Sequence, residues 1–313
     1  MHPRSRAELL ADGYTEHAVR GGVRSGRIER IRHGYYAERD GWDGAYVEER
    51  QRILARAAAD AAHTPPVFCH VTAAALHRLP LSRHVDERAH VLAREGGSGT
   101  STGSVQRHRD RWDGDAVDCG GLLVTTLART VFDVARRARR ETAMACADAA
   151  IRQIAARDDG RRLEAEADAA FRQEIRDLAA RFTGARGVAR ARFVAEAMDP
   201  CAESPGESIS GLYLRDIGFR TFDRQVEIQV PEGRRYFVDF AFAGILGEYD
   251  GATKYLNRAM RGGRSSEQVV FDEKRREDRI RAATGRRVLR WTTREIRTRD
   301  TFREFLSSHG VRP

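Results

Sequence analysis

The chain has 313 residues, of which 41% are hydrophobic and 32% are charged. Single hydrophobic cores stop growing near this length, so we expect more than one domain. No apolar run approaches the roughly 20 residues that cross a bilayer, and no apolar signal segment follows the N-terminus. The composition therefore excludes a membrane-spanning class and predicts a cytoplasmic protein.

The formal net charge is +9 and the isoelectric point is near 9.8. A basic protein without a membrane signature most often meets nucleic acid, because its cations neutralise phosphates and release counterions. Arginine-rich drift without any partner is the alternative, and charge alone leaves both open. The cysteines are scattered without C-x-x-C spacing, so we expect reduced core thiols rather than disulfides or zinc ligands. They are Cys69, Cys119, Cys146 and Cys201.

Residues 1–45 have the pattern of a small winged helix-turn-helix. Ser5 and Glu8 form a capping-box pattern before a short helix, and Thr15 can cap a second helix that Gly26 ends. A strand and a glycine-containing turn flanked by aromatic residues follow. In such a unit, four basic side chains would face DNA phosphates or the major groove. They are Arg20, Arg24, Arg27 and His33. The alternative is a packing unit whose arginines are merely solvated.

Residues 46–140 alternate short helices and short strands. The patterns predict helices over 46–62 and 127–135 and strands at 90–92, 105–108 and 122–124. His70 and His77 stand seven apart in a helical stretch, but no third metal ligand follows at a fitting spacing. We therefore expect a structural or partner-facing role for both histidines.

Three motifs of the first half resemble, in their order, the AbiEi-type family of abortive-infection antitoxins, which carries a winged-helix N-terminus in many actinobacterial proteins. They are His33-Gly34-Tyr35-Tyr36, the segment 70–81, and the segment 124–133, which reads VTTLARTVFD. The resemblance implies an antitoxin-like region over 46–140 and a cognate toxin protein as partner. Residues 141–199 read as a helical spacer, to which we assign no chemistry.

The composition shifts near Pro200, which marks a last domain over 200–313. Pro205 can sit in the first turn of a helix that carries Glu207. Three strands follow, over 225–230, 236–242 and 245–250. A period of two places Tyr236, Val238, Phe240 and Phe242 on one face of the second strand, leaving Asp239 on the other, and places Glu248 and Asp250 on a common face of the third.

If these strands pair as a meander, Asp239 and Glu248 can converge on one hard cation. Mg²⁺ or Mn²⁺ is normally held by one or two carboxylates, waters and phosphate oxygens. Such a cation polarises water for phosphodiester hydrolysis, and a nearby lysine would stabilise the leaving oxygen. The alternative is turn chemistry, with Asp250-Gly251 as a hairpin signal.

The motifs Val238-Asp239-Phe240 and Glu248-Tyr249-Asp250-Gly251, after a helix carrying Glu207, resemble the PD-(D/E)XK nuclease superfamily. They are most similar to its branch of very-short-patch repair endonucleases. The resemblance covers roughly 200–305 and implies that Glu207, Asp239 and Glu248 form the metal site. Asp250 stands where the superfamily usually has a catalytic lysine, so this sequence departs there from the pattern, and Asp250 becomes a candidate further ligand.

Only two of the 55 basic residues are lysines, Lys254 and Lys274, and both follow the carboxylate cluster. Arginine does not replace a compact ammonium group that approaches a phosphoryl oxygen. Either lysine is therefore a candidate for stabilising the charged transition state.

A helix over 265–284 and a strand over 288–291 end the predicted domain. Eleven arginines stand between Arg264 and Arg299 against six acids, which is typical of a surface that follows a DNA backbone. Arg276 and Arg290 belong to this set, whereas Trp291 is expected in the core.

Together these patterns predict an α/β (α+β) protein with an N-terminal winged helix, a central mixed and helical region, and a C-terminal restriction-endonuclease-like mixed sheet flanked by helices. The predicted activity is Mg²⁺- or Mn²⁺-dependent hydrolysis of DNA, in phage defence or a toxin–antitoxin system. The alternative is a non-catalytic antitoxin that represses its own transcription and keeps a degenerate nuclease fold. The sequence leaves the oligomeric state open.

Overall fold

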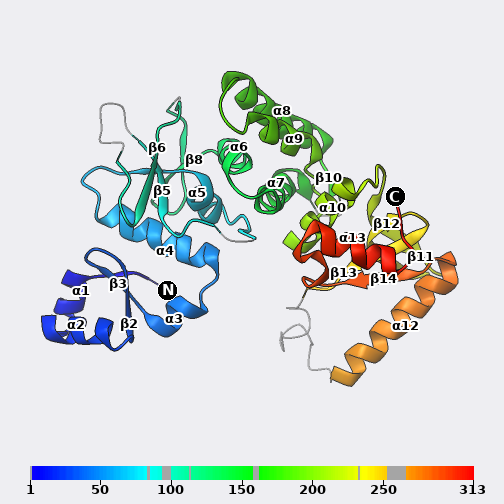
Figure 1. Ribbon diagram of the computed structural model, residues 1–313, viewed down its shortest axis with the longest axis horizontal. Helices are drawn as coiled ribbons and strands as arrows, with labels where there is room; N and C mark the ends of the chain where they lie inside the picture. Colours follow the sequence, from blue (N-terminus) through cyan, green and yellow to red (C-terminus); the bar gives the residue numbers. More distant parts are fainter. Residues whose placement is uncertain are drawn as a thin grey trace. The chain divides into compact units, whose positions relative to one another are not determined.

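The computed structural model describes residues 2–82, 85–93, 100–112, 114–157, 162–231, 233–251 and 266–313. It has a mixed α+β fold, as predicted, and its contacts divide the chain into two compact units (Figure 1). Unit 1 comprises Met1–Ala155 with Glu164–Met198, and unit 2 comprises Ala156–Leu163 with Asp199–Pro313. The division after Met198 lies one residue from the domain boundary that the proline shift predicted.

Unit 1 begins with two helices and a small antiparallel sheet. These elements are β1 (Arg4–Ser5), α1 (Arg6–Ala11), α2 (Glu16–Arg24), β2 (Ile28–Arg32) and β3 (Tyr35–Glu38), with sheet order β1-β3-β2. Ser5 and Glu8 form the predicted capping box on α1, and the Thr15 side chain accepts a hydrogen bond from the backbone N–H of Ala18 at the start of α2. The order of the two helices and the strand after them therefore follows the sequence pattern.

The rest of unit 1 is a five-stranded mixed sheet with helices. Its elements are α3 (Arg39–Gly44), α4 (Val47–Asp60), β4 (Val67–Phe68), α5 (His70–Leu76), β5 (Ala89–Leu92), β6 (Val105–His108), β7 (Ala116–Asp118), β8 (Leu123–Thr125), α6 (Leu127–Arg137), α7 (Arg140–Ala155), α8 (Ala165–Arg181) and α9 (Val188–Ala197). The strand order is β6-β5-β4-β8-β7. One apolar cluster joins Ala37 and Trp42 of the N-terminal segment to Ile53, Phe68 and Val124, so the first 45 residues share a core with the five-stranded sheet and α4.

Unit 2 is built on a four-stranded sheet of order β11-β12-β13-β14. Its elements are β9 (Ala156–Arg157), β10 (Arg162–Leu163), α10 (Pro205–Ile217), β11 (Asp223–Gln229), β12 (Arg235–Phe242), β13 (Ile245–Tyr249), α12 (Ser266–Thr284), β14 (Val288–Trp291), η3 (Glu295–Arg297) and α13 (Arg299–Ser308). The first three strands of the sheet form the expected antiparallel meander, and β14 pairs parallel with β13 after α12.

Helices cover both faces of this sheet (Figure 1). On one face, Trp291 donates its indole N–H to Ser210 of α10 at 2.8 Å and packs its ring 5.2 Å from Phe302 of α13. On the other face, Ile280 of α12 joins an apolar cluster with Leu246. Trp291 is 1% exposed, so it is a core residue, as the sequence predicted.

The alternation of side chains along β12 breaks at Asp239. Val238 belongs to the cluster that contains Ile280, whereas Phe240 and Phe242 place their rings 5.5 and 6.4 Å from Trp291. The prediction that these apolar residues share one face is therefore wrong. The break lies opposite Gln225 of β11, whose φ of +47° takes it out of the regular strand conformation.

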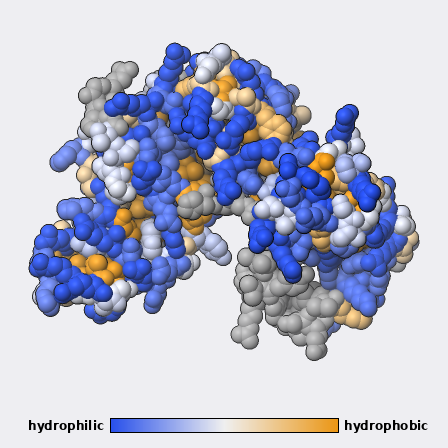
Figure 2. All heavy atoms as spheres, viewed as in Figure 1, coloured by the Kyte–Doolittle hydropathy of each residue, from blue (hydrophilic) through white to orange (hydrophobic). Residues whose placement is uncertain are grey.

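The face of the molecule in Figure 2 is mostly hydrophilic in both units. Within the described residues, no helix combines the length and the apolar character that crossing a membrane requires.

Candidate functional site

Glu207 is held at the start of α10 by the local sequence. Ser204 caps the helix and accepts a hydrogen bond from the backbone N–H of Glu207 at 3.2 Å, and Pro205 occupies the first turn. The Glu207 carboxylate in turn accepts from the Ser204 hydroxyl at 2.7 Å and from the backbone N–H of Glu203 at 2.9 Å. A Cβ on Gly206 would lie 2.0 Å from the Tyr249 ring, so this position must be glycine for α10 to approach the end of β13.

Asp239 lies where β12 and β13 part. Their ladder ends at the pair Phe240 and Gly247, and beyond it Asp239 Oδ2 accepts a hydrogen bond from the backbone N–H of Tyr249 at 2.8 Å. The carboxylate therefore takes the place of a strand partner and is fixed at the end of β13.

Gln225 joins Glu207 to Asp239. Its side-chain Nε2 lies 3.4 Å from Glu207 Oε2 and 3.5 Å from Asp239 Oδ1. These separations are at the long end for N–H···O bonds. One amide group thus brings together a carboxylate of α10 and a carboxylate of β12. We call these two acids the Glu207–Asp239 pair. Sequence reasoning missed Gln225, because nothing in an alternating strand pattern predicts a glutamine whose backbone has a positive φ.

Glu248 lies in a different environment from the Glu207–Asp239 pair. The residue is 6% exposed, and its carboxylate forms ion pairs with Arg276 at 2.7 Å and with Arg290 at 2.8 Å. Arg290 also lies 3.6 Å from Asp250, and both arginines pair with Glu273 of α12. We call these five residues the arginine–carboxylate cluster.

Burial lowers the pKa of both arginines in this cluster, but the hydrogen bonds and charges of the carboxylates outweigh it. Glu248 and Glu273 raise the pKa of Arg276, and Glu273, Glu248 and Asp250 raise that of Arg290. Both guanidinium groups are therefore firmly charged and engaged with acids inside the unit.

The structure thus separates the predicted acids into two groups. Glu207 and Asp239 meet through Gln225, whereas Glu248 and Asp250 meet Arg290. Among the described residues, the sets of three or more ligating groups whose atoms lie within 4.8 Å of one another do not include Glu207, Asp239 and Glu248 together. Lys274 is exposed on α12, and Lys254 lies outside the described residues.

The predicted DNA-contacting residues of the winged helix are at the surface. Arg20 and Arg24 lie on α2, Arg27 follows it, and His33 lies in the turn between β2 and β3. All four side chains are exposed. The structure therefore leaves these basic side chains accessible.

The two histidines that stand seven apart do not meet. His77 Nε2 lies 2.8 Å from the carbonyl oxygen of Thr125, which fits a structural role. His70 instead lies near Cys69, which is also buried, and near His108, which is half-buried. Sequence spacing missed this group because His108 comes from a separate element.

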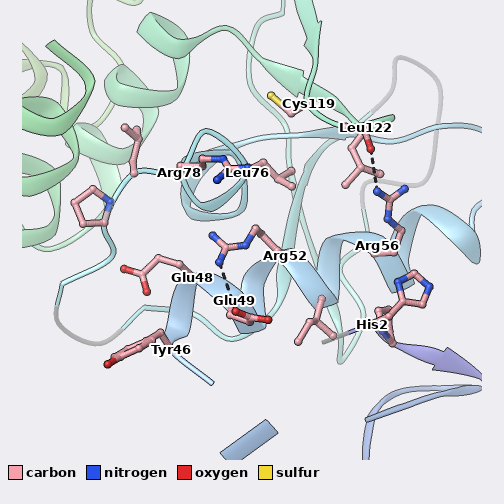
Figure 3. Close-up of a pocket in the computed structure, with 15 residues that line it drawn as sticks. His2, Tyr46, Glu48, Glu49, Arg52, Arg56, Leu76, Arg78, Cys119 and Leu122 are labelled. Carbon is pink, nitrogen blue, oxygen red and sulfur yellow. Dashed lines mark hydrogen bonds and ion pairs between the residues drawn. The ribbon is translucent and has the colours of Figure 1, made fainter. Parts of the chain in front are cut away.

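A hollow of about 910 Å³ lies in unit 1 beside α4 (Figure 3). Arg52 in its wall lies 3.8 Å from Glu49, and Arg56 donates to the Gly120 carbonyl at 2.9 Å. Because these charges are paired within the wall, we assign the hollow no ligand.

No known family model matches the chain. Two uncharacterized proteins from two strains of Mycobacterium tuberculosis are each 29% identical to it over 254 residues, covering 75% of this chain and 86% of the relative. A match of this length exceeds unit 1 and so extends into both units.

Proposed function

We propose that unit 2 is a metal-dependent, endonuclease-like module that hydrolyses DNA phosphodiesters, and that the winged helix of unit 1 binds the duplex. The observation that carries this proposal is the Glu207–Asp239 pair at the point where β12 and β13 part. Its setting in a helix, a three-stranded meander, a helix and a parallel strand supports the resemblance to the PD-(D/E)XK nucleases.

The Glu207–Asp239 pair fits a hard divalent cation. Mg²⁺ takes one or two carboxylates from a protein and completes its shell with water and phosphate oxygens. Glu207 and Asp239 would hold Mg²⁺ or Mn²⁺ in place of the long hydrogen bonds from Gln225. When bound, such an ion polarises a phosphoryl oxygen and a water molecule.

The surrounding residues orient the acids and balance their charge. The backbone N–H of Tyr249 fixes Asp239, and Ser204 fixes Glu207. Glu248 and Asp250 support the site from the arginine–carboxylate cluster, and Glu248 reaches a cation only if it leaves Arg276 and Arg290. Lys254 and Lys274 both remain candidates for stabilising charge on the phosphate.

The exposed cations of the winged helix support duplex binding. Arg20 and Arg24 would contact phosphates or base edges from α2, with Arg27 and His33 beside them. Contacts of this kind position the protein on DNA and make its affinity salt-dependent.

A second candidate is a non-catalytic antitoxin that represses its own transcription, with a toxin protein as partner. The two ion pairs of Glu248 favour it, because arginines that neutralise an acid internally take the place of a cation. Under this alternative, duplex binding requires Arg20 and Arg24 and is indifferent to Asp239.

Nicking of supercoiled plasmid tests the proposal. The full chain is incubated with plasmid and Mg²⁺, with Mn²⁺, or with chelator, in parallel with Asp239→Asn, Glu207→Gln and the surface control Glu304→Gln. We expect metal-dependent nicking by the wild type and the control, and a loss of at least roughly 100-fold in the two site variants. Equal product in every variant, or none from the wild type with either ion, rejects the endonuclease and leaves the binder.

A further inference from the structure

Three histidines and a cysteine gather inside unit 1. Cys69 and His70 lie at the junction of β4 and α5, and His90 and His108 lie on the parallel strands β5 and β6. The His108 ring centroid is 3.9 Å from that of His70 and 5.0 Å from that of His90. Ligating atoms of Cys69, His70 and His108 all lie within 4.8 Å of one another.

Two ring nitrogens in this group have no hydrogen-bond partner among the described residues. They are Nε2 of His70 and Nε2 of His90. The two residues are 2% and 7% exposed, respectively. Buried polar atoms are nearly always satisfied, so an orphaned nitrogen needs an explanation. His70 also has a φ of +52°, an unusual conformation for a residue with a side chain, and such strain clusters at functional sites.

The structure assigns to Cys69, His70 and His108 the role of a binding site for a divalent cation of the zinc class. One thiolate and two imidazoles are the borderline-soft ligands that Zn²⁺ and Co²⁺ prefer, and three protein ligands leave one coordination position for water. This site is separate from the acids of unit 2 and does not depend on the function proposed for them.

The neighbouring groups fit this role. His108 Nε2 lies 2.9 Å from His90 Nδ1, which leaves its Nδ1 for a metal. His90 therefore orients His108, as outer partners orient ligands in metal sites. Asp86 lies 3.7 Å from His90 Nε2, which is beyond hydrogen-bond distance.

Two nearby acids form a second set with His70 but are less suited to a cation. Asp133 lies 2.9 Å from Arg129, and Asp110 lies 3.3 Å from Arg136. Because these carboxylates already neutralise arginines, they compensate positive charge near the site rather than supply ligands. The proposal therefore revises the sequence-based expectation that Cys69 is a reduced core thiol and not a zinc ligand.

Co²⁺ as a spectroscopic probe tests the proposal on the full chain, after reduction and removal of metal with chelator. We expect a thiolate-to-cobalt charge-transfer band that saturates at one Co²⁺ per chain and disappears when Zn²⁺ is added. Cys69→Ser should abolish the band, and Cys119→Ser should keep it. His90→Asn, which alters only an outer partner, should weaken Zn²⁺ affinity by roughly 10–100-fold.

Absence of the band from the wild type, or its persistence in Cys69→Ser, overturns the proposal. If Cys69→Ser does not fold, His108→Asn and the wild-type spectrum decide. A wild-type band that survives in Cys119→Ser, Cys146→Ser and Cys201→Ser comes from Cys69 and supports the site, whereas a band lost in any of those variants contradicts it.

Discussion

Gln225 and Asp239 are the two residues on which the candidate site of unit 2 depends most. Asp239 was readable in the sequence, because Val-Asp-Phe places one acid in an apolar strand. Gln225 was not, since a φ of +47° at a glutamine comes from the tertiary setting and not from local preference. The break in the side-chain alternation of β12 at Asp239 also explains why Glu248 meets Arg276 and Arg290 instead of the Glu207–Asp239 pair.

At the same scale, Gly247 of β13 should tolerate no side chain. A Cβ there would lie 2.4 Å from the Trp291 ring, which is buried beside Phe240 and Phe302 and has no room to move. Overpacking of this kind costs about 1–3 kcal/mol, so we expect Gly247→Ala to lower the free energy of unfolding by this amount. Gly103→Ala, which meets no atom within 4 Å, should leave denaturant unfolding unchanged and serves as the control. An unchanged unfolding midpoint in Gly247→Ala contradicts the close packing of Trp291 on β13.

At the scale of elements, the capped helices were the most predictable part of the fold. Ser5 and Thr15 each cap the helix that the sequence assigned to them, and Thr126 caps α6. The short strands β4 and β7 were not predicted, because two or three residues carry little periodic signal. The helix α13 was also not predicted, although Thr298 and Thr301 form a capping box at its start.

The cap of α6 gives a direct test at this scale. Thr126 accepts a hydrogen bond from the backbone N–H of Arg129 at 3.3 Å. Thr126→Ala should lower the free energy of unfolding by about 1 kcal/mol, whereas Thr126→Ser keeps the acceptor and should be close to neutral. Thermal unfolding of the two variants measures the difference, and equal losses in both would show that the hydroxyl has no capping role.

The ion pair between Glu273 of α12 and Arg290 of β14 should make the free energy of unfolding depend on pH in the acid range. Burial raises the pKa of Glu273, but hydrogen bonds and charges of Arg290 and Arg276 outweigh it and hold that pKa below its usual value. A carboxyl group whose pKa is lower in the folded state stabilises the protein above the unfolded value of about 4.3, and this stabilisation is lost as the pH falls through the folded value. In urea titrations, Glu273→Gln should therefore lose stability at neutral pH and show a flatter decline with acid than Glu304→Gln, the exposed control. Parallel curves for the two variants would exclude the cluster as a source of acid sensitivity.

For the whole molecule, the net charge of +9 left open whether the chain meets nucleic acid or no partner at all, and it located no contact surface. Many arginines are engaged with acids of their own unit, as Arg276 and Arg290 are, so composition overstates the charge available to DNA. Residues 1–45 also share their core with the five-stranded sheet, through Ala37 and Trp42. Truncation of the winged helix would therefore disturb unit 1, and point variants are the better probe.

Arg20→Ala and Arg24→Ala should each weaken duplex binding and reduce the slope of log affinity against log salt by about 1. Arg176→Ala is the matched control, because Arg176 is exposed but paired with Glu196 at 2.7 Å. Fluorescence anisotropy over a range of salt concentrations measures all three variants. Equal slopes for the α2 variants and the control would show that DNA is not bound through α2.

Binding of Mn²⁺ to the full chain, followed by electron paramagnetic resonance of the free ion, tests the central claim that Glu207 and Asp239 jointly hold a divalent cation. The titration is done with Zn²⁺ already present, so that Cys69, His70 and His108 do not compete. We predict one bound Mn²⁺ per chain in the wild type and in Glu304→Gln, and loss of binding in Asp239→Asn and in Glu207→Gln. Equal binding by all four proteins, or no binding by the wild type, would contradict the claim.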